Sequence, residues 1–567
     1  MRAWRTGPRR RRSFAVVAAI TLAAATALAG CTAGSGTTSK ADSSITLSAP
    51  WEVTYGENWN PFTAVALGGE GGGGGPGLGW VYEELVRTRL GDGTVVPWLA
   101  KSWDFSNGGK TVTFHLQPKA TWSNGKPVTA DDVVYSLGVP LKYPELNPIG
   151  VKYKTVTKID EKTVQVTWDE PAYSHLVDLY YPTMIVPVSI WGSKDPRTFI
   201  DKKPVGSGPA TVKTFSPQQV TFNLRTDYWG GTFPMKTMRW TVSSASSSQG
   251  LISNGSLDAT CCIANYTQFI NSDPKHHVLY MQPDGSESAL VFNTAKGPFA
   301  DVNLRHAIAD SVAIEQIRKL GEAKSPRTFP PASISGLSPD VFGKVISPKY
   351  KTRPPGANPT AAKADLAAGG YTVSNGKLIK DGKVVPLELL VNVADTNFGD
   401  AKSFGALLVQ QFKQSIGVDV TITPLPDDQF SEQTKEGKFD MYVGSNAFGS
   451  GRGIYWSYRN LTSDFLAPIG KEADANYGRF NDATFNSLVA AYANTGDAAE
   501  QTKIAGQIQD EFVAQMPAVP LISGGGQLVL NTTHWTGWPT DDNLDHVPSI
   551  GNGQDFIMTM LQLKPAK

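Results

Sequence analysis

The chain has 567 residues, 40% of them hydrophobic, with 52 basic and 51 acidic residues and a formal net charge of +1. Six of the arginines, and no acidic residue, fall within residues 1–30, so the chain that follows carries a net charge of about −5. A mildly acidic body of this kind argues against nucleic acid as a partner. The length exceeds what one hydrophobic core supports and predicts two or three lobes.

The N-terminal residues read as an export signal. The basic run Arg9–Arg12 precedes an apolar, alanine-rich segment at Phe14–Leu28, which is shorter than the roughly 20 residues that span a membrane. Residues 28–31 match the bacterial lipobox, in which Cys31 is lipidated. We therefore expect an exported chain anchored by lipid to the outer face of the cell membrane. The arginine run also weakly resembles a twin-arginine signal, so the export route stays open.

Two further cysteines, Cys261 and Cys262, are adjacent in the sequence. In an exported protein they could form a vicinal disulfide, and two buried thiols are the equal alternative. His276–His277 follow, but their spacing matches no zinc pattern, so we expect no metal. We expect no cofactor either.

The predicted elements begin with a short strand at Ile45–Leu47. The stretch Glu70–Gly79 is nearly all glycine, but no Lys–Ser/Thr pair follows it, so it is not predicted to cradle phosphate. Residues 81–86 carry apolar side chains at helical spacing. We expect a helix there that ends at the turn Gly91–Gly93.

Farther along, Thr111–Leu116 alternates polar and apolar residues, as a half-buried strand does. Thr129 precedes Asp131 and Asp132, which predicts the start of a helix whose dipole favours negative charge. A hairpin is expected around Asp160–Glu161. Further elements are predicted as strands at Val220–Leu224, Ser288–Asn293, Leu387–Val393 and Val418–Ile422 and helices at Tyr173–Leu179, Ala361–Leu366, Leu407–Ile416, Phe485–Tyr492 and Ala499–Met516.

A series of motifs spread over the chain resembles the family 5 extracytoplasmic solute-binding proteins of ABC importers, the peptide, nickel and oligosaccharide group. The densest match lies within residues 82–133, and others run to the C-terminal part. The motif residues are Tyr82–Glu83, Pro97–Ala100, Trp103, Phe114–Leu116, Trp122, Gly125–Pro127, Thr129–Val133, Pro204–Pro209, Asn254–Asp258, Pro298–Phe299, Phe439–Asp440 and Pro517–Leu521.

The resemblance implies an α/β fold, the periplasmic-binding-protein type II clamp, with two lobes, an extra family 5 domain and a discontinuous first lobe. The divisions that we predict are a signal peptide over 1–30, a tether over 31–43, lobe I in three parts (44–92, 204–297 and 529–567), its extra domain over 93–203, and lobe II over 298–528.

The resemblance also implies a function. A protein of this family captures its ligand by lobe closure and delivers it to a membrane permease driven by an ATPase. We expect a monomer. We also expect no enzymatic activity, since the chain has no Walker A motif, nucleophile elbow or His-Glu-x-x-His helix. A secreted hydrolase is a remote alternative.

The ligand class depends on the loop at residues 444–456. Family peptide binders usually carry an aspartate there that pairs with the peptide ammonium, whereas this loop contains no acid. The segments 455–461, 467–480 and 535–543 instead resemble the family's oligosaccharide binders. We therefore favour a short oligosaccharide and keep an oligopeptide as the alternative.

A sugar site needs flat aromatic faces and neutral amides. Any one of the tryptophans could equally fill a hydrophobic core. The residues predicted to bind the ligand are Trp51, Trp59, Asn60, Asn446, Arg452, Trp456 and Trp538.

Overall fold

The computed structural model divides the chain into two units, residues 1–42 and residues 43–567. The first unit, with Cys31, lies outside the described residues. In the part that the structure describes, no helix is long and apolar enough to cross a membrane. The described residues are 43–48, 55–63, 77–89, 93–147, 150–179, 183–324, 331–394, 401–445, 453–539, 550 and 553–566.

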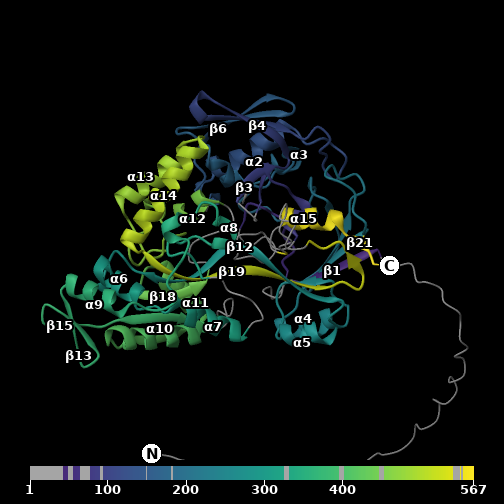
Figure 1. Cartoon of the computed structure of the whole chain (residues 1–567). Helices are drawn as coiled ribbons and strands as arrows, with labels where there is room; N and C mark the ends of the chain where they lie inside the picture. The colour runs from purple at the N-terminus through teal and green to yellow at the C-terminus, as the bar shows by residue number, and fades with distance from the viewer. Residues whose placement is uncertain are drawn as a thin grey trace, which may run out of the picture. The chain divides into compact units, whose positions relative to one another are not determined.

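The second unit is built on a ten-stranded mixed sheet, in which strands far apart in the sequence lie side by side (Figure 1). Across the sheet, the strands are β17 (Thr421–Leu425), β16 (Glu388–Asn392), β18 (Met441–Ser445), β12 (His277–Phe292), β19 (Ala518–Asn531), β11 (Ala259–Thr260), β1 (Ser44–Ser48), β10 (Thr237–Thr241), β9 (Gln219–Leu224) and β8 (Ala210–Ser216).

Two long antiparallel strands, β12 and β19, join the halves of this sheet. Their register is interrupted between Pro283 and Ser286, opposite Gly524–Gly526. Beyond the interruption, from Ser288 onward, β12 also pairs with β18, whereas the far end of β19 pairs with β11. Both strands therefore pass from one half of the sheet to the other at this point.

The second half of the sheet is covered by helices on both faces, as the side-chain alternation of β12 shows. Leu290 and Phe292 belong to one buried cluster, and Ala289 and Val291 belong to another. Strand β17 begins at Thr421, three residues later than its predicted start. The helices that contribute to these clusters include α6 (Val302–Asp310), α7 (Ile314–Lys324), α9 (Pro359–Ala368), α10 (Ala401–Ile416), α13 (Ala483–Asn494) and α14 (Ala498–Gln515).

Residues 93–203 contain a separate sheet of four antiparallel strands. We call this range of residues the four-stranded unit. The order of the strands in this sheet is β4 (Ala100–Ser106), β5 (Thr111–Leu116), β7 (Thr163–Trp168) and β6 (Tyr153–Asp160). The predicted strand at Thr111–Leu116 and the hairpin around Asp160–Glu161 are therefore confirmed.

Helix α2 (Ala130–Lys142) packs against this sheet and begins where the sequence predicts. Thr129 and Asp132 form a capping box. The Asp132 carboxylate accepts hydrogen bonds from Thr129 N at 2.8 Å, Trp122 Nε1 at 3.2 Å and Val188 N at 2.9 Å. This carboxylate therefore joins the helix start to two neighbouring segments.

The helix predicted over residues 81–86 is wrong. A short helix, α1 (Leu78–Val81), ends there, and the chain continues as a hairpin of β2 (Val86–Arg89) and β3 (Thr94–Pro97). Glu83 forms a bridge with Ile185, whose backbone N donates to Glu83 O at 2.8 Å. These long-range pairings outweigh a helical spacing that extends over fewer than two turns.

The other elements are short. They are α3 (Val188–Trp191), α4 (Ala245–Ser253), α5 (Tyr266–Ser272), α8 (Pro339–Phe342), α11 (Asp427–Lys435), α12 (Ile454–Arg459), α15 (Gly553–Gln562), the 3₁₀ helices η1 (Asn107–Gly109), η2 (Pro144–Leu146), η3 (His175–Leu179), η4 (Pro298–Ala300), η5 (Pro348–Tyr350) and η6 (Ser463–Phe465), and the strands β13 (Tyr371–Ser374), β14 (Lys377–Lys380), β15 (Lys383–Val385), β20 (Trp535–Thr536) and β21 (Lys564–Pro565).

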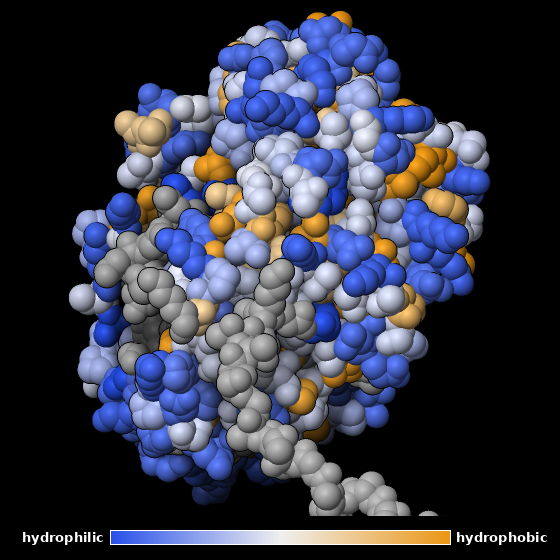
Figure 2. Space-filling model, turned by 90° about the vertical axis from the view of Figure 1, so that its right-hand side faces the viewer, coloured by the Kyte–Doolittle hydropathy of each residue, from blue (hydrophilic) through white to orange (hydrophobic). Residues whose placement is uncertain are grey.

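The coloured surface in Figure 2 is mostly hydrophilic, with apolar side chains gathered near the middle of that face. Single exposed apolar side chains, such as Ile159 and Ile200, are ordinary on a protein surface.

Candidate functional site

Three of the predicted ligand residues, Trp51, Asn446 and Arg452, lie outside the described residues. Four others are described, and they belong to two separate parts of the molecule. Trp59, Asn60 and Trp538 lie with the hydrophobic cluster that β1, β9, β10, α15 and the four-stranded unit share. Trp456 lies on α12, among helices of the other part. Helices α12 and α15 stand on opposite sides of the middle of the molecule in Figure 1.

Trp59 and Asn60 are both fully buried. The Trp59 ring meets Phe222 edge to face, with centroids 5.6 Å apart. The Asn60 amide donates to Pro196 O at 2.7 Å and to Phe199 O at 2.8 Å, and its oxygen accepts from Phe62 N at 2.9 Å. This amide holds a loop together, and its binding to a ligand stays a prediction.

Trp538 is partly exposed and lies beside α15. Its indole Nε1 donates to Trp535 O at 3.1 Å, and its ring centroid lies 6.5 Å from that of Phe556. One edge of the indole is thus held by the protein while part of its surface remains accessible. This is the arrangement that an aromatic platform for a ligand requires.

Trp456 lies on α12, directly after the loop that the sequence singled out, and its side chain is 8% exposed. The guanidinium of Arg459 stacks over the Trp456 ring, 4.7 Å from its centroid. Because the two residues are three positions apart on the helix, they share one face. A cation above the ring fixes its orientation.

Arg459 also pairs with Asp178 of η3, in the four-stranded unit, and both side chains are buried. The other oxygen of Asp178 lies 3.0 Å from His175 Nδ1, and the Tyr455 hydroxyl lies 3.3 Å from the same nitrogen. Burial, with the Asp178 charge adding to it, raises the pKa of Tyr455. Neither Asp178 nor His175 belongs to a motif of the family resemblance, so sequence reasoning did not find these two residues.

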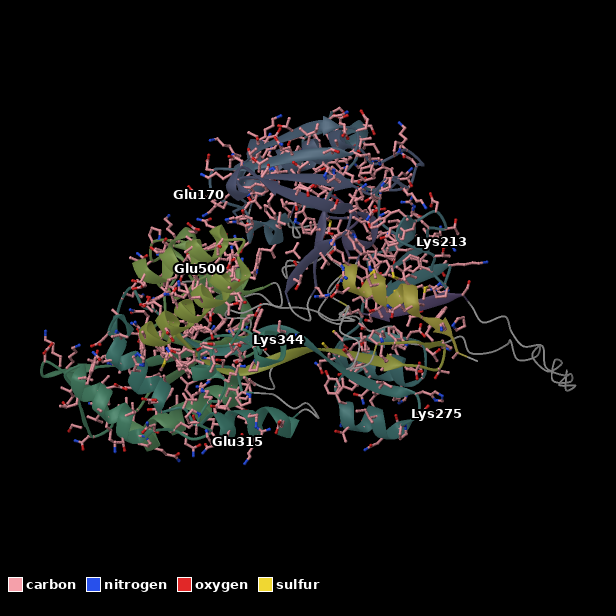
Figure 3. All side chains as sticks on the ribbon, turned by 45° about the horizontal axis from the view of Figure 1, so that its top comes forward. Glu170, Lys213, Lys275, Glu315, Lys344 and Glu500 are labelled. Carbon is pink, nitrogen blue, oxygen red and sulfur yellow. The ribbon has the colours of Figure 1, made fainter. Side chains whose placement is uncertain are left out.

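A cavity of about 490 Å³ adjoins this ion pair. The four-stranded unit contributes Trp168 and Glu170 to its wall, and α12 and α13 contribute Tyr455 and Asn494. In Figure 3, Glu170 lies at the edge of the four-stranded unit, near the helix pair that carries Glu500. Within the described residues, the cavity is therefore bounded by two parts of the fold.

Glu83, a residue of the family resemblance, is a fully buried carboxyl. Its two oxygens accept hydrogen bonds from the Tyr228 hydroxyl at 2.8 Å and from Trp229 Nε1 at 3.0 Å. Burial raises the pKa of Glu83 to about 7, although these hydrogen bonds and the charge of Arg225 oppose the shift. It links the segment before β2 to the loop after β9.

The sulfur atoms of Cys261 and Cys262 lie 2.8 Å apart, whereas a disulfide bond measures about 2.05 Å. The vicinal disulfide stays a prediction. His276 Nδ1 lies 2.8 Å from Asp273, and His277 Nδ1 lies 2.8 Å from Phe269 O. Within the described ranges, no group of three His, Cys, Asp or Glu side chains could hold a metal ion.

The family model described as bacterial extracellular solute-binding proteins, family 5 middle, matches residues 94–465, more than half of the chain. The nickel-binding periplasmic protein of Escherichia coli strain K12 is 26% identical over 387 residues, which cover 64% of this chain and 69% of that protein. Heme-binding protein A of Haemophilus influenzae is 25% identical over 488 residues, which cover 79% and 82% of the two chains.

Solved structures show the same fold. A periplasmic oligopeptide-binding protein of an ABC transporter from Thermotoga maritima aligns with a TM-score of 0.78 and 19% identity, over 93% of this chain and 100% of that one. The same protein bound to mannohexaose aligns with a TM-score of 0.73 and 19% identity, over 93% and 99%. These likenesses establish the periplasmic-binding-protein type II fold for this chain.

Proposed function

The chain belongs to the bacterial extracellular solute-binding proteins of family 5, which serve ABC importers, and on this premise we propose that it captures a short oligosaccharide by lobe closure. The observation that carries the proposal is the loop at residues 444–456. It contains no carboxylate to pair with a peptide ammonium, and it leads into the tryptophan of α12. An oligopeptide is the alternative, because relatives of the same fold are named for peptides.

Each of the lobes that would close holds most of one half of the large sheet, and β12 and β19 pass between the two halves. Lobe I comprises 44–92, 204–297 and 529–567 together with the four-stranded unit, and lobe II comprises 298–528. Trp538 comes from the first lobe and Trp456 from the second. Support for a sugar also comes from the same fold holding mannohexaose in the Thermotoga maritima protein.

We also propose that the chain is exported, anchored through Cys31 and active as a monomer that meets a permease and its ATPase at the membrane. Residues 28–31 support the anchor, as the lipobox they form is the signal for lipidation. We expect no catalysis, since the relatives described above are named as binding proteins.

Thermal unfolding of residues 43–567 against two panels tests the ligand class. One panel holds cello-, xylo- and manno-oligosaccharides, and the other holds di- to pentapeptides. A compound at 100 times its dissociation constant stabilises the native state by about 2.7 kcal/mol. A shift with the sugars alone is expected. A shift with the peptides alone would reject the sugar proposal.

Trp456→Ala and Trp538→Ala are expected to weaken binding of the compound that gives the largest shift by about tenfold or more, because each removes an aromatic face. The matched control is Trp103→Ala, which removes a partly buried tryptophan from β4 in the four-stranded sheet. Unchanged affinity in both test variants would remove these two residues from the site.

A further inference from the structure

The four-stranded unit and the second lobe meet along η3, α12 and α13. Ser174 N donates to Ala493 O at 3.3 Å, and the Tyr455 and His175 rings meet edge to face at 5.1 Å. The ring of Tyr173 lies so close to Gly496 that an added Cβ there would be 2.7 Å from it. We call this set of contacts the junction.

The junction contains two ion pairs of different character. Arg459 and Asp178 are buried, with side chains 6% and 4% exposed. Lys152 and Asp464, 2.6 Å apart, are half exposed. An exposed pair contributes little, whereas a buried charge that loses its partner is strongly destabilising. The arrangement of the junction therefore depends on the buried pair.

Arg459 connects this pair to the predicted ligand site. Its guanidinium lies 4.7 Å from the Trp456 ring centroid, 5.2 Å from that of Phe465 and 5.7 Å from that of Tyr455. Arginine stacks on aromatic faces through its planar group while its N–H groups remain available for a carboxylate. One side chain thus contacts the aromatic face of α12 and the acid of the opposite unit.

We propose that Arg459 is a positioning residue that couples lobe closure to the ligand site. When the lobes close, Asp178 receives the guanidinium, and the guanidinium holds Trp456 in the orientation that a ligand meets. When the lobes open, Arg459 loses this buried partner and Trp456 loses a fixed support. This proposal rests on the proposed capture by closure and does not depend on whether the ligand is a sugar or a peptide.

The exposed pair supplies a reporter for the closed junction. A carbodiimide joins an amine and a carboxylate that are in direct contact, so it should link Lys152 to Asp464 only while the junction is closed. The experiment uses residues 43–567, which form a compact unit with their own hydrophobic clusters. Lys152→Gln must abolish the crosslinked peptide and so identifies it.

We expect Asp178→Asn and Arg459→Gln each to reduce the crosslink yield in folded protein about tenfold, with Asp178→Glu restoring most of it. The matched control is Lys154→Gln, which removes an exposed ion pair with Asp169 inside the four-stranded unit. If either variant lowers the melting temperature but keeps the wild-type yield, Arg459 has only a structural role and the proposal is overturned.

Binding of mannohexaose is measured in the same variants. If wild-type protein binds it, the dissociation constant should rise with the loss of crosslink and recover in Asp178→Glu. An affinity that stays constant while the crosslink is lost would reject coupling to the ligand site. If wild-type protein binds no mannohexaose, the sugar proposal is weakened while the crosslink still decides the role of Arg459 in closure.

Discussion

Glu83 is the residue at which burial and ionisation conflict most directly. Its pKa of about 7 in the folded chain exceeds the value of about 4.3 of an exposed glutamate. Between these two pH values, Glu83 is ionised in the unfolded chain and still protonated in the folded chain. The free energy of unfolding therefore falls as the pH rises from about 4.5 to 7. Below that window the carboxyl is protonated in both states and makes no contribution to the pH dependence.

We expect Glu83→Gln to abolish this part of the pH dependence, which amounts to about 3 kcal/mol across the window. The measurement is chemical denaturation at several pH values. The readout is the slope of the unfolding free energy against pH. The absolute stability is not used, because one of the hydrogen bonds from Tyr228 and Trp229 must rearrange in the variant, and this rearrangement lowers stability at every pH. Glu472→Gln, at an exposed position, is the control, and an equal slope in wild type and Glu83→Gln would contradict the assignment.

For single residues, the sequence shows which side-chain types are present but not which contacts each side chain makes. Trp59 and Asn60 have the rings and amides that a sugar site needs, but a core needs rings and a tight loop needs amides as well. The backbone partners at Pro196 and Phe199 show that Asn60 holds a loop together, and its binding to a ligand stays a prediction. Asp178 could not be found from a local pattern, because its partner, Arg459, lies 281 residues farther along the chain.

Among the elements, helix α2 shows how much a local signal can determine. Thr129 before Asp131 and Asp132 predicts a helix start, and the capping box of Thr129 and Asp132 confirms it. The structure adds that Asp132 also accepts from Trp122 Nε1 and Val188 N, which no local pattern could show.

We expect Asp132→Ala to lower the free energy of unfolding by about 3 kcal/mol or more, because it leaves buried donors of three segments without an acceptor. Asp131→Ala is the matched control one residue earlier. Its carboxylate is exposed and pairs with Lys158 at 2.8 Å, so its loss should leave stability nearly unchanged. Equal losses measured by urea denaturation would show that only the charge near the helix start matters.

The incorrect helix prediction at residues 81–86 shows where a local signal is insufficient. Apolar residues three to five apart fit a helix, but over fewer than two turns they also fit a hairpin with a bend. The pairing of Val86–Arg89 with Thr94–Pro97 decides between the two, and it depends on contacts beyond the window that the pattern covers.

For the whole molecule, the motifs spread along the chain predicted the fold, and the family match and solved structures confirm it. The ligand could not be predicted in the same way. The fold is set by many buried positions, whereas ligand class depends on a few side chains in loops that vary within one architecture.

The proposed lobe closure would bend the backbone of β12 and β19 where the two strands pass between the halves of the sheet and their register is interrupted. Glycine allows this because it adopts a wider range of backbone angles than other residues. We expect Gly525→Ala to slow binding of the best panel compound about two- to fivefold, as measured by stopped-flow fluorescence. Gly506→Ala, on α14 with open space around the new methyl group, is the control and should leave the rate unchanged. Equal rates for both variants would place the bend elsewhere.

The position of β19 in the sheet also affects how the protein is made. This strand, close to the C-terminal end, lies between β12 and β11, and β11 pairs with β1 near the beginning of the described chain. The large sheet cannot become continuous until residues 518–531 have been synthesised, and until then β11 and β12 present unpaired edges that favour aggregation. A chain that stops before this strand therefore lacks a continuous central sheet.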